Sequence, residues 1–137
     1  MPAADTVTAH QTAPPVVMVV DDDPDILEAL SEILEVEGFD IRRARNGQEA
    51  LERLGPPPPQ LILLDLMMPV MDGWEFARRL HQREDGRIPI IVLSADRNVG
   101  AKAHELGAVG HLAKPFELSE LLEMVRSSLR PALAERA

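Results

Sequence analysis

The sequence has no cysteine among its 137 residues. Disulfide bonds, thiolate metal sites and a cysteine nucleophile are therefore excluded, and the redox compartment is left open. Cationic residues are also few, because 14 Lys and Arg stand against 23 Asp and Glu, for a formal net charge of −9 at pH 7. A surface of this sign repels a phosphate backbone, so we expect no nucleic-acid binding by this chain alone.

Long apolar runs are missing as well. The longest is about the length of one β-strand, far below the roughly 20 residues that span a bilayer. Residues 1–15 have neither a basic region nor an apolar run, so they are not a signal peptide. They are small, polar and proline-containing, which predicts a disordered N-terminal tail. We therefore expect a cytoplasmic protein with one domain and no membrane partner.

Short apolar runs alternate along the chain with segments of helical periodicity. Strands are expected at residues 16–20, 39–44, 61–64, 88–93 and 109–113. Helices are expected at residues 24–37, 46–54, 74–83, 98–106 and 118–129. A strand–helix pair repeated at intervals of about twenty residues is typical of an α/β fold with a parallel sheet rather than of an eight-unit barrel.

Several helix boundaries are marked by residues with a local reason to be there. Asp23 suits the N-cap of a helix, and Pro24 suits the first turn that follows it. Asn46 suits the N-cap of the next helix.

The four prolines at 56–59 predict a stiff connector, with a ligand for a proline-recognition domain as the alternative. The helix at 98–106 has few large apolar residues, so we expect it to be loosely packed and able to move.

Polar side chains follow four of the predicted strands at the point where each strand ends. They are Asp21 and Asp22, Asp65, Ser94 and Lys114. Right-handed crossovers bring the carboxyl ends of parallel strands to one edge of the sheet, where open α/β folds bind their ligands. The sequence thus predicts three carboxylates, a hydroxyl and an ammonium group together at that edge.

Clustered carboxylates repel one another, so this arrangement needs a cation. Oxygen donors without His or Cys favour a hard ion, and Mg²⁺ commonly combines one or two carboxylates with waters and a phosphate. Asp65 could then act as a nucleophile toward a phosphoryl group. Lys114 can neutralise phosphoryl oxygens, and the Ser94 hydroxyl can donate to one of them. These groups suit phosphoryl transfer to a carboxylate.

Four segments resemble, in order and spacing, the signatures of the receiver domains of two-component response regulators. They are VVDDDPDIL at 19–27, LILLDLMMPVMDG at 61–73, IVLSA at 91–95 and HLAKPF at 111–116. Each is weakly specific alone, and the four together are highly specific. The resemblance implies a flavodoxin-like, doubly wound (βα)5 sandwich with a parallel sheet in the order 2-1-3-4-5. It places a receiver domain at 16–130, between the disordered tail at 1–15 and a short C-terminal tail at 131–137.

The resemblance also assigns the carboxylates. It implies that Asp65 is the phosphoacceptor and that Asp21 and Asp22 form an acidic pair. Together with Asp65 and the backbone carbonyl of Met67, this pair is expected to hold Mg²⁺, with Mn²⁺ as the alternative ion. Met67 stands where some family members have a polar residue that can orient water. We therefore expect Met67 to hinder access to an aspartyl phosphate and to lengthen the life of the signal.

The same resemblance assigns the residues of the switch. Ser94 is the hydroxyl that moves toward the phosphoryl group, Lys114 is the ion-pair partner of that group, and the Lys114–Pro115 peptide bond is expected to be cis. Family members usually carry Tyr or Phe three residues before the lysine, where this chain has His111. We retain His111 as a switch residue, and an imidazole there could make signalling sensitive to pH.

As a function, the resemblance implies a stand-alone response regulator similar to the chemotaxis regulators. It would take a phosphoryl group from a sensor histidine kinase or a histidine phosphotransfer protein and signal to a downstream protein target. It would catalyse at most its own phosphorylation and dephosphorylation, and so is not an enzyme in the ordinary sense. Only eight residues follow Leu129, so no output domain is expected. We expect a monomer or a weak homodimer.

Two alternatives stay open. A phosphohydrolase of the haloacid-dehalogenase type also forms an aspartyl phosphate, but it places a second Asp two residues after the nucleophile, where this chain has Met67. A receiver-fold module that binds proteins without phosphorylation is opposed by the complete acidic set and Lys114, and phosphorylation data would separate it. Taken singly, Asp65 and Lys114 could form a structural ion pair, and Ser94 could be a turn residue.

Overall fold

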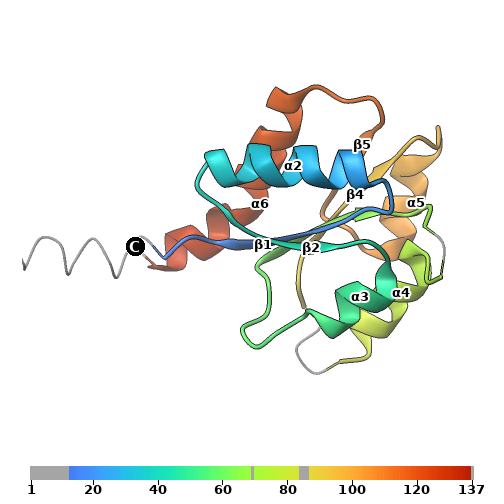
Figure 1. Cartoon of the computed structure of the whole chain (residues 1–137), viewed down its shortest axis with the longest axis horizontal. Coiled ribbons are helices and arrows are strands. Elements are labelled where there is room, and N and C mark those ends of the chain that lie inside the picture. The colour runs from blue at the N-terminus through green and yellow to red at the C-terminus, as the bar shows by residue number, and fades with distance from the viewer. Residues whose placement is uncertain (1–12, 69, 84–86, 137) are drawn as a thin grey trace, which may run out of the picture.

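The computed structural model describes residues 13–68, 70–83 and 87–136, with the backbone alone for residues 130–136 (Figure 1). Residues 1–12 of the predicted N-terminal tail lie outside this part of the chain. Within the described ranges, no helix has both the length and the apolar character that crossing a bilayer requires.

Strands and helices alternate along the described residues in the predicted order. The strands are β1 (Val16–Val20), β2 (Asp40–Ala44), β3 (Leu61–Asp65), β4 (Ile90–Ser94) and β5 (Gly110–Ala113). The helices are α2 (Pro24–Val36), α3 (Gly47–Glu52), α4 (Gly73–His81), α5 (Val99–Leu106) and α6 (Leu118–Arg136). Every strand and helix expected from the sequence is therefore present, and the differences lie at the boundaries.

The five strands form one parallel sheet in the order β2-β1-β3-β4-β5, which confirms the predicted doubly wound topology. All residues of β3 and β4 are buried, as expected for apolar strands that are covered on both faces. β2 lies at one edge and is more exposed, because Arg42 and Arg43 interrupt its apolar run.

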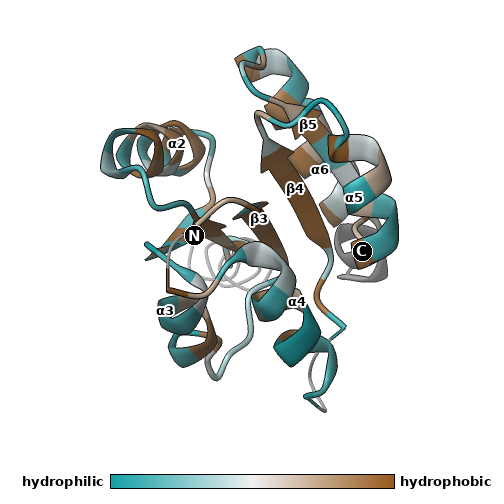
Figure 2. Cartoon of the chain, turned by 90° about the vertical axis from the view of Figure 1, so that its right-hand side faces the viewer, coloured by the Kyte–Doolittle hydropathy of each residue, from teal (hydrophilic) through white to brown (hydrophobic). Residues whose placement is uncertain are grey.

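Helices cover both faces of this sheet, with α2 on one side of the strands and α3 and α4 on the other (Figure 1). Val19 and Leu63 belong to the core under α2 and α6, whereas Val20 and Leu64 belong to the core under α3, α4 and α5. Alternate residues of a strand enter opposite cores because their side chains point to opposite faces. Figure 2 shows β3 and β4 as strongly hydrophobic strands between these layers.

The predicted helix caps are confirmed. The Asp23 carboxylate accepts from the backbone N–H of Asp25 at 2.9 Å, and the Asn46 side chain accepts from that of Glu49 at 2.9 Å. A side-chain oxygen in this position satisfies a backbone donor that has no partner inside the helix. Asp23 is thus used to start α2, which leaves Asp21 and Asp22 for other roles.

The start and end of β4 differ from the prediction. The strand begins at Ile90 and includes Ser94 as its last residue, whereas we expected it to begin at Ile88 and to end at Leu93. Ile88 is buried but precedes the strand, because Pro89 has no N–H to donate to the sheet. The Ser94 backbone is therefore part of the sheet, where its carbonyl accepts from the backbone N–H of Lys114 at 2.8 Å.

The last helix is longer than predicted. We expected Pro131 to end it and residues 131–137 to form a tail, but α6 continues to Arg136. A proline removes one backbone hydrogen bond from a helix, yet its fixed φ is itself helical, so a long helix can continue through it.

The connector at 56–59 is held to the edge of the sheet. The Arg42 guanidinium donates to the carbonyl of Arg53 at 2.9 Å and to the carbonyl of Pro57. Pro59 is buried. These contacts fit a stiff connector, and recognition by a proline-binding domain stays a prediction.

Candidate functional site

The sheet register brings two of the predicted carboxylates together. Val20 pairs with Leu64 across β1 and β3, so Asp21 and Asp65 follow at neighbouring positions. Asp21, Asp22 and Asp65 each offer a carboxylate oxygen, and these oxygens lie within 4.8 Å of one another. Asp21 and Asp65 are buried, with 1% and 6% of their surface exposed, whereas Asp22 faces solvent.

Lys114 follows β5, the strand at the edge of the sheet opposite β2, and its side chain reaches the same cluster. Ser94 pairs with Ala113 across β4 and β5, and the Lys114 backbone N–H donates to the Ser94 carbonyl at 2.8 Å. Its Nζ donates to Asp21 Oδ2 at 3.0 Å and lies 3.8 Å from Asp65 Oδ2. The Lys114–Pro115 peptide bond is cis, as expected. One ammonium group therefore faces both buried carboxylates.

Backbone N–H groups fix the direction in which the two buried carboxylates point. The N–H of Asp23 donates to Asp21 Oδ1 at 2.9 Å, and the N–H of Met67 donates to Asp65 Oδ1 at 3.1 Å. Each bond joins residues two apart, so it follows from the local turn after the strand. In both carboxylates the second oxygen, Oδ2, is the atom nearest Lys114.

Burial raises the pKa of Asp65 from its ordinary value to about 6. The N–H of Met67 and the Lys114 ammonium act in the opposite direction, and the neighbouring Asp21 and Asp22 carboxyls add to the increase. Because burial penalises the charged form, the Met67 N–H and the Lys114 ammonium together do not fully offset it. Additional positive charge at the site would therefore stabilise the ionised form of Asp65.

The donor set fits a hard divalent cation. It consists of carboxylate oxygens without any His or Cys, and three of these oxygens are close enough together to share one ion. Such a set favours Mg²⁺ or Mn²⁺ over softer metals. Asp21, Asp22 and Asp65 could hold the ion, with the Met67 carbonyl as the predicted fourth protein ligand.

The predicted switch residues Ser94 and His111 lie on β4 and β5, respectively. Ser94 is buried, with 1% of its surface exposed, and its hydroxyl accepts from the backbone N–H of Asp96 at 3.1 Å. His111 is exposed, and its ring lies against Gly100 of α5, with Nε2 3.2 Å from the position that a Cβ of residue 100 would occupy. The two residues thus contact the loop before α5 and α5 itself.

The loop after Asp65 exposes two large apolar side chains, those of Met67 and Val70. Met67 is 67% exposed and Val70 is 84% exposed. Val70 also has a φ of +70°, which is rare for a β-branched residue. Met68 and Met71 are buried, whereas Met67 is not. Its side chain lies mostly in solvent, and its effect on access to Asp65 stays a prediction.

Sequence reasoning missed Asp96 and Lys102, which form an ion pair between the loop after β4 and helix α5. The two residues are six apart and lie in different segments, the loop after β4 and helix α5, so the periodicity of a single helix or strand does not relate them. It also missed the positive φ of Val70. No sequence signal would have identified either feature.

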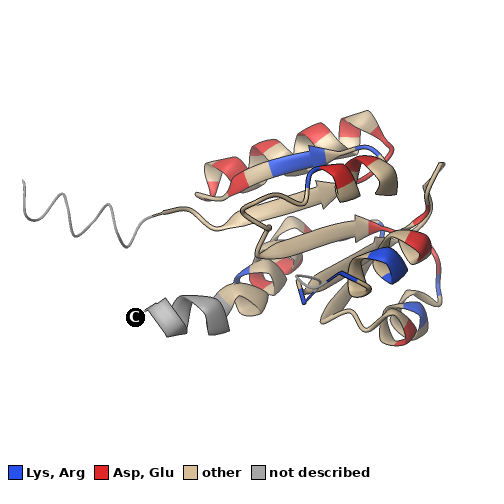
Figure 3. Ribbon diagram, turned by 90° about the horizontal axis from the view of Figure 1, so that it is seen from below, with Lys and Arg blue, Asp and Glu red and all other residues tan. Residues whose placement is uncertain are grey.

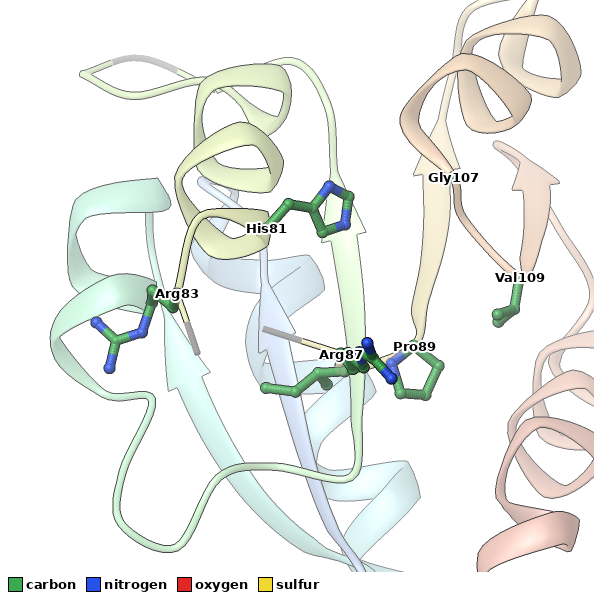
Figure 4. Close-up of a pocket in the computed structure, with 7 residues that line it drawn as sticks. His81, Arg83, Arg87, Pro89, Gly107 and Val109 are labelled. Carbon is green, nitrogen blue, oxygen red and sulfur yellow. The ribbon is translucent and has the colours of Figure 1, made fainter. Parts of the chain in front are cut away.

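A hollow of about 630 Å³ lies at the opposite end of the strands, where β4 and β5 begin. It is lined by His81 at the end of α4, by Arg87 and Pro89 before β4 and by Val109 before β5 (Figure 4). The Arg83 side chain points away from the others in this view. None of the clustered carboxylates lines it, so the hollow is separate from the candidate site.

The chain matches the family model described as response regulator receiver domain over residues 17–126. It is 40% identical over 116 residues to the response regulator MprA of Mycolicibacterium vanbaalenii, a match that covers 83% of this chain and 50% of the relative. The chain thus spans about half the length of this curated relative.

Two solved structures are similar over nearly their whole length. The Vibrio cholerae chemotaxis protein CheY4 is 31% identical, with a TM-score of 0.77, and the match covers 85% of this chain and 100% of that one. The response regulator TrrA of Thermotoga maritima, solved in complex with Mg²⁺-BeF, is 34% identical, with a TM-score of 0.75. This match covers 84% of this chain and 99% of TrrA.

Proposed function

Because the chain belongs to the response regulator receiver domains, we propose that it accepts a phosphoryl group on Asp65 and responds with a change of conformation. The observation that carries this proposal is the meeting of Asp65, the acidic pair and Lys114 at one edge of the sheet. These residues come from the ends of three different strands. A merely structural ion pair would not need a third carboxylate beside it.

The proposed reaction is a displacement at phosphorus. An Asp65 carboxylate oxygen forms a bond to the phosphorus of a phosphohistidine while the P–N bond to the donor imidazole breaks, and the imidazole takes up a proton as it leaves. Asp65 must be ionised to attack, and a pKa of about 6 leaves it mostly ionised at pH 7. The Met67 N–H, which donates to Oδ1, holds this side chain in one orientation.

Two positive charges would stabilise the transferred group. Lys114 lies 3.8 Å from Asp65 Oδ2, so its ammonium can interact with a phosphoryl oxygen attached there. A bound Mg²⁺ would neutralise charge on the phosphoryl oxygens, and Asp21, Asp22 and Asp65 are the carboxylates that would hold it. The structure of the Thermotoga relative contains Mg²⁺-BeF, which supports this choice of ion.

The response would begin at Ser94 and spread to the neighbouring elements. Ser94 ends β4, one residue beyond the Leu93 that pairs with Asp65. A phosphoryl group on Asp65 offers new acceptors to this hydroxyl, and a state in which the loop after β4 closes over them would become favoured. His111 contacts α5, so we retain it as the residue that would report this movement on the surface.

A sensor histidine kinase or a histidine phosphotransfer protein is the proposed donor, and a downstream protein is the proposed target. The overall negative charge, with acidic residues spread over the helices (Figure 3), argues against a nucleic-acid target of this domain. The match covers only 50% of MprA, so the function of the rest of MprA is not inferred for this chain.

The test is phosphorylation followed by intact mass. The protein is incubated with Mg²⁺ and acetyl phosphate, and separately with a phosphorylated histidine donor. A single labile phosphoryl adduct is expected, and it should be lost with Asp65→Asn or with a chelator. Asp40→Asn is a matched control, because Asp40 is an exposed carboxylate on β2, and it should retain the adduct.

The result also separates the alternatives. No adduct from either donor, with no change in Trp74 fluorescence on adding Mg²⁺, would favour a module that works without phosphorylation. Turnover of a phosphomonoester substrate would instead favour a phosphohydrolase.

A further inference from the structure

The loop that joins Ser94 to α5 is held in place by Asp96. The Asp96 backbone N–H donates to the Ser94 hydroxyl oxygen at 3.1 Å. Its carboxylate accepts from the backbone N–H of Asn98 at 2.7 Å and forms an ion pair with the Nζ of Lys102, in the first turn of α5. One residue thus connects the buried hydroxyl at one end of the loop to the helix at the other.

The side chains of this ion pair are less exposed than those of the Arg78–Glu75 pair on α4. The Asp96 and Lys102 side chains are each 31% exposed, whereas Arg78, which pairs with Glu75 on α4, is 59% exposed. The hydrogen bond from Lys102 keeps the pKa of Asp96 below its usual range. Shelter from solvent reduces screening, so the pair is stronger than a fully exposed one.

Little else fixes the start of α5. Its buried side chains are Val99, Ala103 and Leu106, of which only two are large. The Asn98 side chain at the N-cap makes no capping hydrogen bond. Because the apolar contact is small, the polar contacts of Asp96 account for a large share of what positions this helix and its loop.

We propose that Asp96 and Lys102 are positioning residues for Ser94, and that their ion pair holds the loop in the arrangement of the unphosphorylated protein. Movement of Ser94 toward a phosphoryl group on Asp65 draws the backbone of Asp96 with it, while Lys102 stays with α5 on the sheet. The ion pair therefore opposes the switch. This inference rests on the proposed function, since it concerns the same site.

The direction in which two substitutions change the affinity for a phosphoryl mimic distinguishes this role from a simple effect of charge. If the ion pair restrains the loop, Asp96→Asn and Lys102→Met both release it, and both favour the phosphorylated arrangement. If the two residues act only through their charge on an anionic phosphoryl group, removing the anion favours binding and removing the cation opposes it. The two explanations therefore predict opposite results for Lys102→Met.

The experiment measures the affinity of the full chain for beryllofluoride, a stable mimic of an aspartyl phosphate, at saturating Mg²⁺ by titration calorimetry. We expect Asp96→Asn and Lys102→Met each to bind about two- to five-fold more tightly, the range that a partly exposed ion pair supports. The double variant should bind no more tightly than either single variant, because both remove the same contact.

Two controls accompany these variants. Lys102→Arg preserves the ion pair and should bind like the wild type. Arg97→Met removes a cation from the same loop, where Arg97 is exposed and makes no ion pair within the described residues, and it should also leave the affinity unchanged. Amide hydrogen exchange of residues 95–99 in the metal-free protein should be faster in Asp96→Asn and Lys102→Met than in the wild type.

Three results would overturn the inference. Weaker binding by Lys102→Met with tighter binding by Asp96→Asn would show an effect of charge alone. Unchanged affinity in both variants, with faster exchange at residues 95–99, would show that the ion pair orders the loop but has no part in the switch. If the wild type binds no beryllofluoride, the proposed function fails and this inference fails with it.

Discussion

Replacing Asp65 by Asn should stabilise the metal-free protein at neutral and alkaline pH. The Asp65 side chain is buried, and its pKa is raised from 3.8 to about 6, chiefly by burial. A carboxyl group whose pKa is higher in the folded state than in the unfolded state binds its proton more tightly when folded, so ionising it opposes folding. Asn keeps an oxygen that can accept from the Met67 N–H but carries no charge.

The magnitude follows from the size of the shift. A change of about two units, at 1.36 kcal/mol per unit, corresponds to about 3 kcal/mol of destabilisation once Asp65 is ionised. Below pH 4 the group is protonated in both states, so the wild type and Asp65→Asn should be about equally stable. Between pH 4 and pH 6 the wild type should lose this stability progressively. Above pH 7 the full difference of about 3 kcal/mol should be present.

The measurement is urea denaturation followed by circular dichroism at pH 5, 6, 7 and 8 with a chelator present. Asp40→Asn serves as the control for a carboxylate on the surface, and its stability should stay close to that of the wild type at every pH. Addition of Mg²⁺ should raise the stability of the wild type and narrow its difference from Asp65→Asn. A difference of the same size at pH 5 and pH 8, or a less stable Asp65→Asn at pH 8, would refute the reasoning.

Three further predictions concern the loop after Asp65 and the start of α4. Met67→Asn should speed loss of the phosphoryl group, measured as decay of the adduct mass, because a polar side chain at this exposed position can orient an attacking water; an unchanged rate would contradict this. Val70→Asn should raise the free energy of unfolding by about 0.5–1 kcal/mol in urea denaturation, since Asn tolerates a positive φ and the exposed valine loses no packing, whereas a loss of stability would argue against strain. Gly73→Ala should lower that free energy by about 1–3 kcal/mol, because its Cβ would lie 2.8 Å from Leu66 Cα and 3.0 Å from the Asp65 carbonyl. A Gly73→Ala protein as stable as the wild type would show that this close approach can relax.

Much of the fold was predictable because its signals are local. The apolar runs identified all five strands, and Asp23 and Asn46 identified two helix starts through hydrogen bonds within three residues. The errors came from residues whose local preference is overridden by the rest of an element. Ser94 joined β4 because the sheet offered it a partner in Ala113, and Pro131 did not end α6.

The sequence by itself also determined which groups would be available at the site, because parallel strands with right-handed crossovers deliver their carboxyl ends to one edge. Only the tertiary structure decided how these groups act on one another. The raised pKa of Asp65, the contact between Lys114 and Asp21 and the ion pair of Asp96 with Lys102 depend on burial and on distances. Lys114 and Asp21 are 93 residues apart in the chain, and their attraction exists only once the sheet has formed and excluded water from between them.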